Sequence, residues 1–364
     1  MNKSFTSIDK LNNLFWSKIV SSTRQDVSSV SVFRVIAGLF ILLLNVNSFG
    51  WIGSAPRAFF DPPFFSLGIL FKSFPSTAVL RTMEVLMLIC LLFTIAGIRA
   101  RFSTRLYVAL SLIAHSFQFS FGKIDHDIIY LALLLCMSFS GWGTQLALVP
   151  DTMKSSDSPE RSLSLISVLL CFGFFSAGFL KAINWFNLDF TRSGVAFWYY
   201  SGYYAMGRTS LLAPAAQHVP LSVFKIMDYL GVIFELIPLF CLLKSRKMWT
   251  IWLILACSFH LVNLLLLNIA FFTNALAYLA FIDYSALGQK IRKNRSLITA
   301  FLVMTLFVFI IRLYNVLFYV EDMSMLFIKD TDIKTCLWIY LIIWLFTLSV
   351  FIRYFRRLLR PAVV

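Results

Sequence analysis

The stretch that decides the fold is FGFFSAGFLKAINW, residues 172–185. It closes an apolar segment, residues 163–180, that contains no charged side chain. A helix of about 20 apolar residues is long enough to cross the hydrocarbon of a bilayer. Lys181 follows directly, so it lies where such a helix would leave the hydrocarbon. A charged residue at this boundary is either a headgroup anchor or a functional residue.

The whole chain has the composition of a membrane protein. Of its 364 residues, 59% are hydrophobic and 13% are charged, and the mean hydropathy is +0.81. Apolar runs recur between residues 30 and 354, and they are continuous, which favours helices over the alternating strands of a barrel. The sequence therefore predicts an all-α, polytopic membrane protein with about ten transmembrane helices.

The basic residues support this interpretation and indicate an orientation. The formal net charge of +15 comes from short basic connections between apolar runs, as the positive-inside rule produces, so nucleic acid is not a predicted partner. Residues 248–283 carry no charge until Asp283 and are long enough to cross twice. With that double crossing, both termini are predicted to be cytoplasmic, and the bacterial plasma (inner) membrane is the expected location.

The predicted crossings are residues 30–49, 77–98, 106–121, 128–142, 163–180, 223–243, two within 248–283, 296–318 and 335–354. Four regions follow from this pattern: an amphipathic interfacial helix in 1–27, a membrane domain over 28–285, two additional helices in 296–354 and a basic cytoplasmic tail at 355–364. For residues 1–27, a helix packed on the protein is an equal alternative. Residues 186–222 are aromatic-rich and predict a partly helical excursion at the membrane interface.

This topology places several polar residues toward the outer side. They are His126 before the fourth crossing, Lys181 to Trp185, and His115, His260 and Glu84 within helices. An ionisable residue inside a bilayer costs about 2.5–3.5 kcal/mol on insertion scales and commonly marks a site. The alternatives are a Lys181 that extends to the headgroups, a His126 in a loop, and His115, Glu84 and Glu235 in ordinary contacts between helices.

An ordered set of segments resembles a known family. The segments are FRVIAGLFILLL, GIRARFS, GKIDHDIIYLALLL, SAGFLKAINW, FELIPLF and SFHLVNLLLLNIAFF, which lie in that order within residues 28–285. Together they resemble the horizontally transferred transmembrane domain (HTTM) family, which is related to the vitamin K-dependent gamma-carboxylases. The chain differs from the carboxylases in having Leu180 before Lys181, and neither their large extracytoplasmic domain nor their outer cysteine bridge is expected within these 364 residues.

The resemblance implies a site and a chemistry. Lys181 is similar to the base that starts the oxygenation of reduced vitamin K, and His126 resembles a histidine of the active region. His260, Trp185 and His115 would contact the cofactor, a reduced, vitamin K-like quinone, and no metal is implied. The partners would be the bilayer, the quinone and an extracytoplasmic peptide substrate. The alternative function is a transporter or an export-assisting membrane protein whose polar residues line a path.

Overall fold

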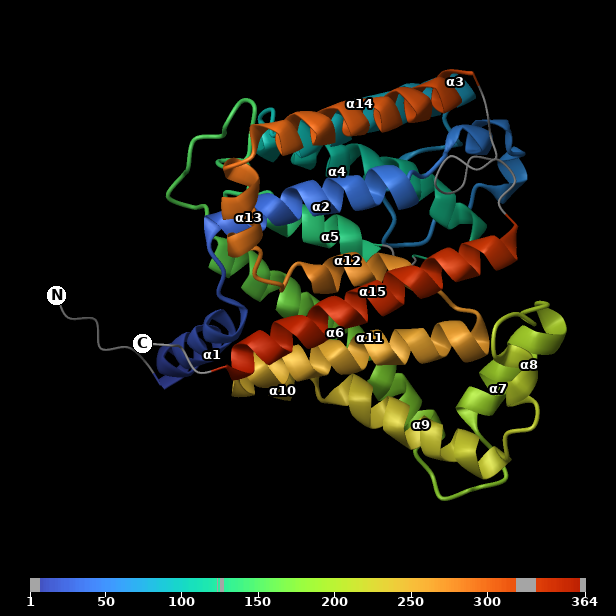
Figure 1. Ribbon diagram of the computed structural model, residues 1–364. Coiled ribbons are helices and arrows are strands. Elements are labelled where there is room, and N and C mark those ends of the chain that lie inside the picture. The colour runs from blue at the N-terminus through green and yellow to red at the C-terminus, as the bar shows by residue number, and fades with distance from the viewer. Residues whose placement is uncertain (1–6, 123, 125–127, 319–331, 361–364) are drawn as a thin grey trace. The chain divides into compact units, whose positions relative to one another are not determined.

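The computed structural model describes every residue except 1–6, 123, 125–127, 319–331 and 361–364 (Figure 1). Within these limits the chain is helical, and its one β-type feature is an isolated bridge between Ile98 and Val149. The predicted all-α fold is therefore confirmed. The longer helices are α1 (Ser7–Thr23), α2 (Val27–Leu44), α3 (Thr77–Ala96), α4 (Ala100–Gln118), α5 (Ile128–Met137), α6 (Pro159–Trp185), α9 (Leu221–Leu236), α11 (Arg246–Leu267), α14 (Arg295–Leu317) and α15 (Ile333–Leu359).

The remaining elements are shorter. They are the α-helices α7 (Gly194–Tyr200), α8 (Ala213–Ala216), α10 (Pro238–Lys244), α12 (Phe272–Leu279) and α13 (Ser285–Arg292), the 3₁₀ helices η1 (Gly50–Ser54), η2 (Arg57–Phe59), η3 (Leu67–Leu70) and η4 (Phe119–Phe121), and the π-helical turn η5 (Ser201–Ala205). Residues 186–222 are thus partly helical, as the sequence predicts, and contain no helix long enough to cross a membrane.

The prediction of about ten crossings is wrong. Among the described residues, six helices are long and apolar enough to span a membrane, namely α2, α3, α6, α11, α14 and α15. The count becomes seven if α9 and α10, which meet at a bend of 46°, form one broken span. The chain is therefore a multi-pass helical membrane protein with six or seven candidate spans.

Three predicted crossings fail for physical reasons. The helix α5 has 10 residues and α12 has 8, so they are about 15 and 12 Å long, far short of the hydrocarbon thickness. The helix α4 has 19 residues, but Arg101 and Arg105 in its first two turns make it too polar. The charge-free residues 248–282 do not form two equal spans, because α11 ends at Asn268 in a left-handed conformation with φ 51°.

Helix boundaries coincide with capping residues. The hydroxyl of Ser158 accepts a hydrogen bond from Arg161 N (3.2 Å), directly before Pro159 opens α6. Ser245 accepts one from Met248 N (3.2 Å) at the start of α11. Gly97 ends α3 with φ 69°, a conformation that glycine adopts without steric cost.

Two compact units make up the chain. One comprises residues 1–24, 163–278 and 333–364, here the lysine unit, and the other comprises residues 25–162 and 279–332, here the arginine unit. In the arginine unit α3 packs on α2, α4 and α14, and α13 packs on α2. In the lysine unit α11 packs along α15, α1 contacts α10 and α11, and α7 packs on α9.

Two buried arginines stabilise the arginine unit from within. The Arg34 guanidinium on α2 donates to the carbonyl oxygens of Trp142 (2.8 Å), Gln145 (3.2 Å) and Leu146. Arg312 on α14 donates to the carbonyl oxygens of Leu42 (3.1 Å) and Leu43 (2.8 Å) near the end of α2. Carbonyl groups without hydrogen-bond partners are costly in a bilayer. Each arginine therefore donates to carbonyl oxygens that no helical hydrogen bond uses.

Candidate functional site

Lys181 is paired with a carboxylate on another helix. Its Nζ forms an ion pair and a hydrogen bond with Oε1 of Glu235, the penultimate residue of α9. The Lys181 side chain is 29% exposed and that of Glu235 is 4% exposed. The charged end of Lys181 is therefore not simply an anchor in the headgroups, because it has a specific and buried partner within the protein.

A glycine makes this pairing possible. Gly178 is one turn before Lys181, and a Cβ atom built there would lie 2.7 Å from Cβ of Glu235 and 3.2 Å from its carbonyl carbon. Only a residue without a side chain allows α6 and α9 to approach this closely. The short distance between the helices brings the lysine within reach of the carboxylate.

The second carboxylate oxygen of Glu235 can accept a further hydrogen bond. Oε1 accepts the bond from Lys181, whereas Oε2 is buried and has no hydrogen-bond partner among the residues that the structure describes. A buried acceptor without a partner is expensive and needs an explanation. It marks the place where a further hydrogen-bond donor would be stabilised.

Trp185 completes the immediate surroundings of Lys181. It lies one turn further along α6, with its ring centroid 5.4 Å from Lys181 Nζ, within range of a cation–π contact. A Cβ at Gly194 would lie 2.1 Å from the indole, so the loop backbone packs closely against the ring. The indole is thus held between an ammonium group and the start of α7.

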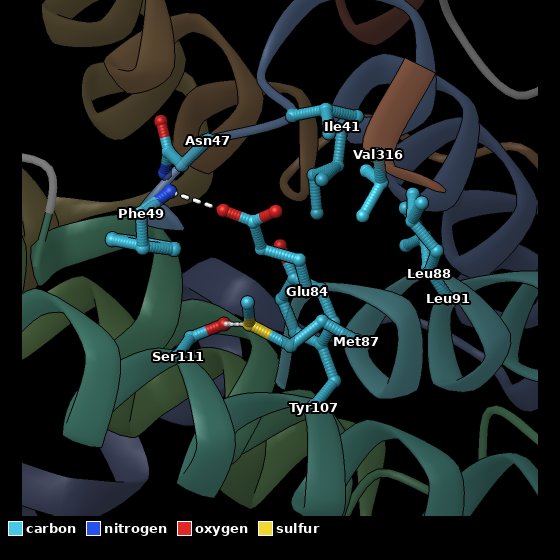
Figure 2. Close-up of a pocket in the computed structure, with 11 residues that line it drawn as sticks. Ile41, Asn47, Phe49, Glu84, Met87, Leu88, Leu91, Tyr107, Ser111 and Val316 are labelled. Atoms are coloured by element: carbon cyan, nitrogen blue, oxygen red, sulfur yellow. Dashed lines mark hydrogen bonds between the residues drawn. The ribbon is translucent and has the colours of Figure 1, made fainter. Parts of the chain in front are cut away.

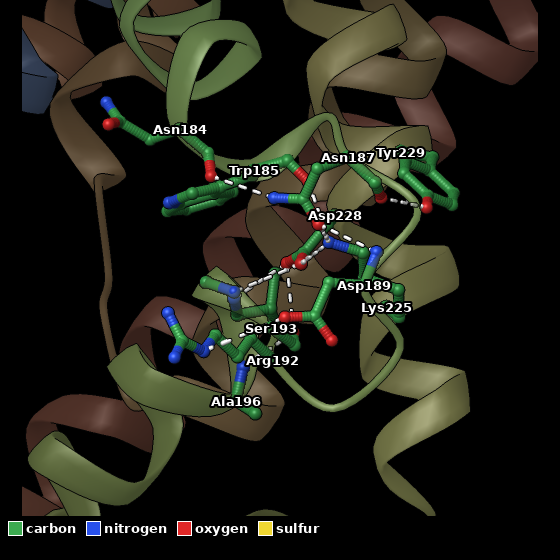
Figure 3. Close-up of polar contacts among 12 residues, drawn as sticks. Asn184, Trp185, Asn187, Asp189, Arg192, Ser193, Ala196, Lys225, Asp228 and Tyr229 are labelled. Carbon is green, nitrogen blue, oxygen red and sulfur yellow. Dashed lines mark hydrogen bonds and ion pairs between the residues drawn. The ribbon is translucent and has the colours of Figure 1, made fainter.

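A polar network fixes the chain just after Lys181 (Figure 3). The fully buried Asp228 on α9 accepts hydrogen bonds from Ser193 Oγ (3.0 Å), Gly194 N (3.0 Å) and Val195 N (2.8 Å), and so caps α7. These contacts fasten the loop that follows α6 onto α9.

Lys225 extends this network to the end of α6. Its ammonium donates to the Trp185 carbonyl oxygen (2.9 Å) and to Asn187 Oδ1 (3.0 Å), and it lies 3.9 Å from Asp228 Oδ2. The Lys225 side chain is 1% exposed. It therefore satisfies a terminal carbonyl of α6 and orients Trp185.

His260 belongs to the same unit, in an aromatic setting. Its Nε2 is 2.8 Å from the Tyr278 hydroxyl, and its ring centroid is 4.9 Å from that of Trp344 on α15. Phe174 on α6 contacts both the His260 ring (6.0 Å) and the ring of Phe234, the residue before Glu235 (5.5 Å). An aromatic layer thus connects His260 to the helices that carry the ion pair.

His115 lies in the arginine unit and contacts Asn47, Phe49 and Ser111, which line a cleft (Figure 2). Its Nδ1 is 2.8 Å from the Ser111 carbonyl oxygen, which only accepts, so Nδ1 carries the proton and Nε2 accepts from Asn47 Nδ2 (3.1 Å). The Phe49 ring packs on the imidazole at 4.9 Å. His115 therefore orients Asn47 and Phe49, which line the cleft.

The cleft is lined mainly by apolar side chains, with a few polar ones. Its empty volume, including the open mouth, is about 340 Å³, and its lining residues are Ile41, Val46, Asn47, Phe49, Glu84, Met87, Leu88, Leu91, Tyr107, Ser111 and Val316. Glu84 accepts from Gly50 N (2.8 Å), from Phe49 N and from Arg81 (3.1 Å). This carboxylate is fully used in holding η1 against α3, so it acts as a structural residue of the cleft wall.

The sequence-predicted site residues are thus distributed as follows. Lys181, Trp185 and His260 belong to one unit, His115 belongs to the other, and His126 lies outside the described residues. Sequence reasoning identified Glu235 as a polar residue of its crossing but did not pair it with Lys181. It missed Lys225 and the importance of Gly178, although the three-residue spacing of Lys225 and Asp228 was a signal for a contact on one helix face.

The fold and these contacts define a class: a multi-pass helical membrane protein with a lysine–glutamate pair whose carboxylate is buried. Comparison of the chain with protein-family models, with curated proteins and with solved structures finds no match.

Proposed function

We propose that the protein is an integral membrane enzyme whose proton-transfer centre is the pair formed by Lys181 and Glu235. The observation that carries the proposal is the geometry of this pair: a partly exposed ammonium bonded to one oxygen of a buried carboxylate, with the other oxygen unpartnered within the described part of the chain. Such a pair holds a proton between two groups and leaves an acceptor for a substrate.

The physical basis is the cost of charge in a bilayer. A carboxylate buried in a low-dielectric medium pays a large desolvation penalty, which its neutral acid form avoids. A proton that moves from Lys181 Nζ to Glu235 leaves an uncharged amine, which is a base. The HTTM resemblance assigns this same lysine as the base, and Glu235 would be the group that accepts its proton.

The chemistry of the site fits a reduced quinone as cofactor. Glu235 Oε2 would accept a hydrogen bond from a quinol hydroxyl, and the exposed rings of Phe175 and Phe179, stacked at 5.8 Å, supply apolar surface on α6. When bound, a reduced vitamin K-like quinone would supply an oxygen-driven strong base. Trp185 would orient Lys181, and an extracytoplasmic peptide is the substrate class that the resemblance implies.

We further propose that the basic end of each unit faces the cytoplasm. In the arginine unit, the loop at residues 142–149 contacts the ends of two helices. Leu148 N donates a hydrogen bond to the carbonyl oxygen of Ala96 at the end of α3 (3.0 Å). Arg292 at the end of α13 donates one to the side-chain oxygen of Gln145. Arg99, Arg101 and Arg105 therefore gather at the same end as Lys290, Arg292 and Lys293. In the lysine unit, Arg246 donates a hydrogen bond to the Tyr354 hydroxyl (2.6 Å). This contact brings the basic start of α11 close to the basic end of α15.

One observation favours transport as a second candidate. The helix axis bends by 46° between α9 and α10, directly after Glu235, and Pro238 opens α10. Broken helices with a charged residue at the break are a recurring feature of transporters. In that function the Lys181–Glu235 pair would bind and release a proton or an ionic substrate as the helix break moves.

The test compares substitutions of Lys181 in purified protein in lipid nanodiscs. Wild-type protein is supplied with a reduced naphthoquinone and oxygen, and consumption of the quinol is followed by chromatography. Lys181→Arg and Lys181→Ala are expected to lower the rate at least about 100-fold, because arginine does not give up its proton. Lys244→Arg, at an exposed lysine of α10, is the matched control and should retain the full rate.

Two outcomes would contradict the enzyme proposal. One is a Lys181→Arg variant with the wild-type rate, which removes Lys181 as the base. The other is a wild-type protein that does not consume the quinol above the rate of empty nanodiscs. In the second case, wild-type and Lys181→Arg protein in liposomes are compared for proton flux, and a loss of flux in the variant would establish the transport candidate.

A further inference from the structure

Residues 57–72 of the arginine unit, which contain η2 and η3, expose many apolar side chains. Phe64 is 78% exposed, Phe65 is 88% exposed and Leu70 is 77% exposed. Further exposed apolar side chains in this segment are Phe59, Leu67, Ile69 and Phe71. Isolated exposed apolar residues are ordinary, but a contiguous set of this kind marks an interaction surface.

This loop makes defined contacts with α4. Ser66 is 5% exposed, and its hydroxyl donates to the Ser116 carbonyl oxygen (2.9 Å) near the end of α4 and accepts from Gly68 N (3.2 Å) at the start of η3. The Phe71 ring packs edge-on against the fully buried Phe117 at 4.9 Å. The loop is therefore fastened to α4 at these points while its neighbouring apolar side chains point away.

A glycine fixes the approach of the loop to α4. A Cβ atom at Gly68 would lie 2.8 Å from both the Ser116 carbonyl oxygen and Cβ of Pro62. The loop backbone is thus in close contact on two sides. On a loop held at these points, Phe64 and Phe65 are the most exposed phenylalanines.

The position of the loop indicates a lipid partner. It leads into α3, whose exposed residues Val79, Leu86 and Phe93 recur every seven positions and so form one outward-facing stripe. That stripe belongs to a candidate membrane span, and a membrane is what an outward apolar stripe of a span contacts. The exposed apolar residues of the loop therefore precede, in the chain, a span whose outward stripe is apolar.

The charges at the two ends of the loop fit the same partner. Arg57 and Lys72 are both exposed and flank the apolar residues. Basic side chains beside aromatic ones are typical of segments that lie in the interface, with the cations at lipid phosphates and the rings at the headgroup boundary. A water-exposed loop would need neither arrangement.

We propose that the loop of residues 57–72 is a membrane-interface anchor, in which Phe64, Phe65 and Leu70 insert into the lipid beside the start of α3. The bilayer is the partner, and Arg57 and Lys72 contact its phosphates. The anchor fixes the depth of this end of the arginine unit relative to the membrane surface. It is independent of the Lys181–Glu235 chemistry.

The test measures the surroundings of single spin labels in proteoliposomes of purified protein and pure phospholipid. Cysteines are introduced at Phe64, Phe65 or Leu70 in a background without native cysteines. Phe307, 63% exposed on α14, is the lipid-facing control, and Ser155, in an exposed polar loop, is the aqueous control. Labels in the loop should resemble that at Phe307, with collisions with oxygen exceeding those with a water-soluble nickel complex.

A second measurement needs no substitution. Wild-type protein in vesicles that contain a lipid with a photoreactive group on its acyl chain is irradiated, digested and mapped by mass spectrometry. Crosslinks are expected within residues 57–72 as well as on α14. The proposal is overturned if the loop labels resemble the one at Ser155, or if α14 is crosslinked and the loop is not; either result would also leave a protein as the partner of this surface.

Discussion

Gly178 of α6 lies directly against Glu235 of α9. A side-chain carbon at position 178 would come within 2.7 Å of Cβ of Glu235, closer than nonbonded carbon atoms approach. Lys181 is three residues further along α6, on the same face of the helix. The glycine therefore sets the helix separation at which the lysine and the carboxylate form their ion pair.

Gly178→Ala is expected to destabilise the protein by about 1–3 kcal/mol, because the added methyl group must force the two helices apart. Gly173→Ala on the same helix is the matched control, since a Cβ there meets nothing within 4 Å. It should be neutral or stabilising, because alanine favours a helix by about 1 kcal/mol over glycine. Thermal unfolding in detergent, followed by dye labelling of the buried cysteines, measures both. Equal stability of the two variants would contradict the close contact.

Removal of the lysine and removal of the glutamate should lower the stability of the folded protein by different amounts. Lys181→Met leaves the Glu235 carboxylate buried at 4% exposure without its cation, whereas Glu235→Gln leaves Lys181 at 29% exposure with a route to polar surroundings. Breaking a buried pair costs about 3–5 kcal/mol, so Lys181→Met should approach that range and Glu235→Gln should cost clearly less.

A double variant tests whether the two charges of this pair interact. Lys181→Met combined with Glu235→Leu removes both charges, and its stability should exceed that of Lys181→Met alone. The measurement is a double-mutant cycle of unfolding midpoints. Strictly additive effects would show that the two side chains do not interact in the folded protein.

Asp228→Ala is expected to release the start of α7, because three hydrogen bonds to the loop and the helix N-terminus end on this carboxylate. Loss of a capping residue costs about 0.5–2 kcal/mol, and the buried Lys225 would also lose a neighbouring charge. Hydrogen exchange of residues 186–200 should accelerate. Asp189→Ala, at a loop carboxylate outside this cap, should change exchange at residues 189–192 only; an equal effect of both would contradict the assignment.

Cysteine labelling checks the proposed orientation within the arginine unit. Ser76 caps the start of α3, and the basic end lies beyond Ala96, about 30 Å along the same helix. In intact cells, a membrane-impermeant reagent should label Ser76→Cys and should label Ser155→Cys only after permeabilisation. The reverse pattern would invert the orientation, and Cys336→Ser removes background from the native cysteine that is not buried.

The helical class was predictable because a bilayer demands it. The span of α3, Thr77–Ala96, nearly matches the predicted residues 77–98, since an apolar run with a serine before it and a glycine after it carries its own boundaries. The number of crossings was not predictable, because hydropathy does not show where a helix is interrupted. Residues 248–282 lack charge throughout, and the separation of the 22-residue α11 from the 8-residue α12 depends on the backbone conformation of Asn268.

The partner of Lys181 was beyond sequence reasoning for a related reason. Lys181 and Glu235 are 54 positions apart, and the helices that carry them are apolar on most faces, so no amphipathic pattern identifies which face meets which. A short-range signal did exist for Lys225 and Asp228, three residues apart on α9. Contacts within one helix turn can be predicted from spacing, whereas contacts between helices need the packing.

The three carbonyl contacts of Arg34 have a consequence for biosynthesis. Arg34 is translated 108 residues before Trp142, the first of its acceptors. At about 5–20 residues per second, the ribosome needs roughly 5–20 s to produce that segment. During this interval the nascent α2 carries a guanidinium into the insertion machinery before its native acceptors exist. Insertion of the first span must therefore proceed with water, lipid phosphate or the translocon as a temporary partner, and its final position is fixed only when the 142–146 loop arrives.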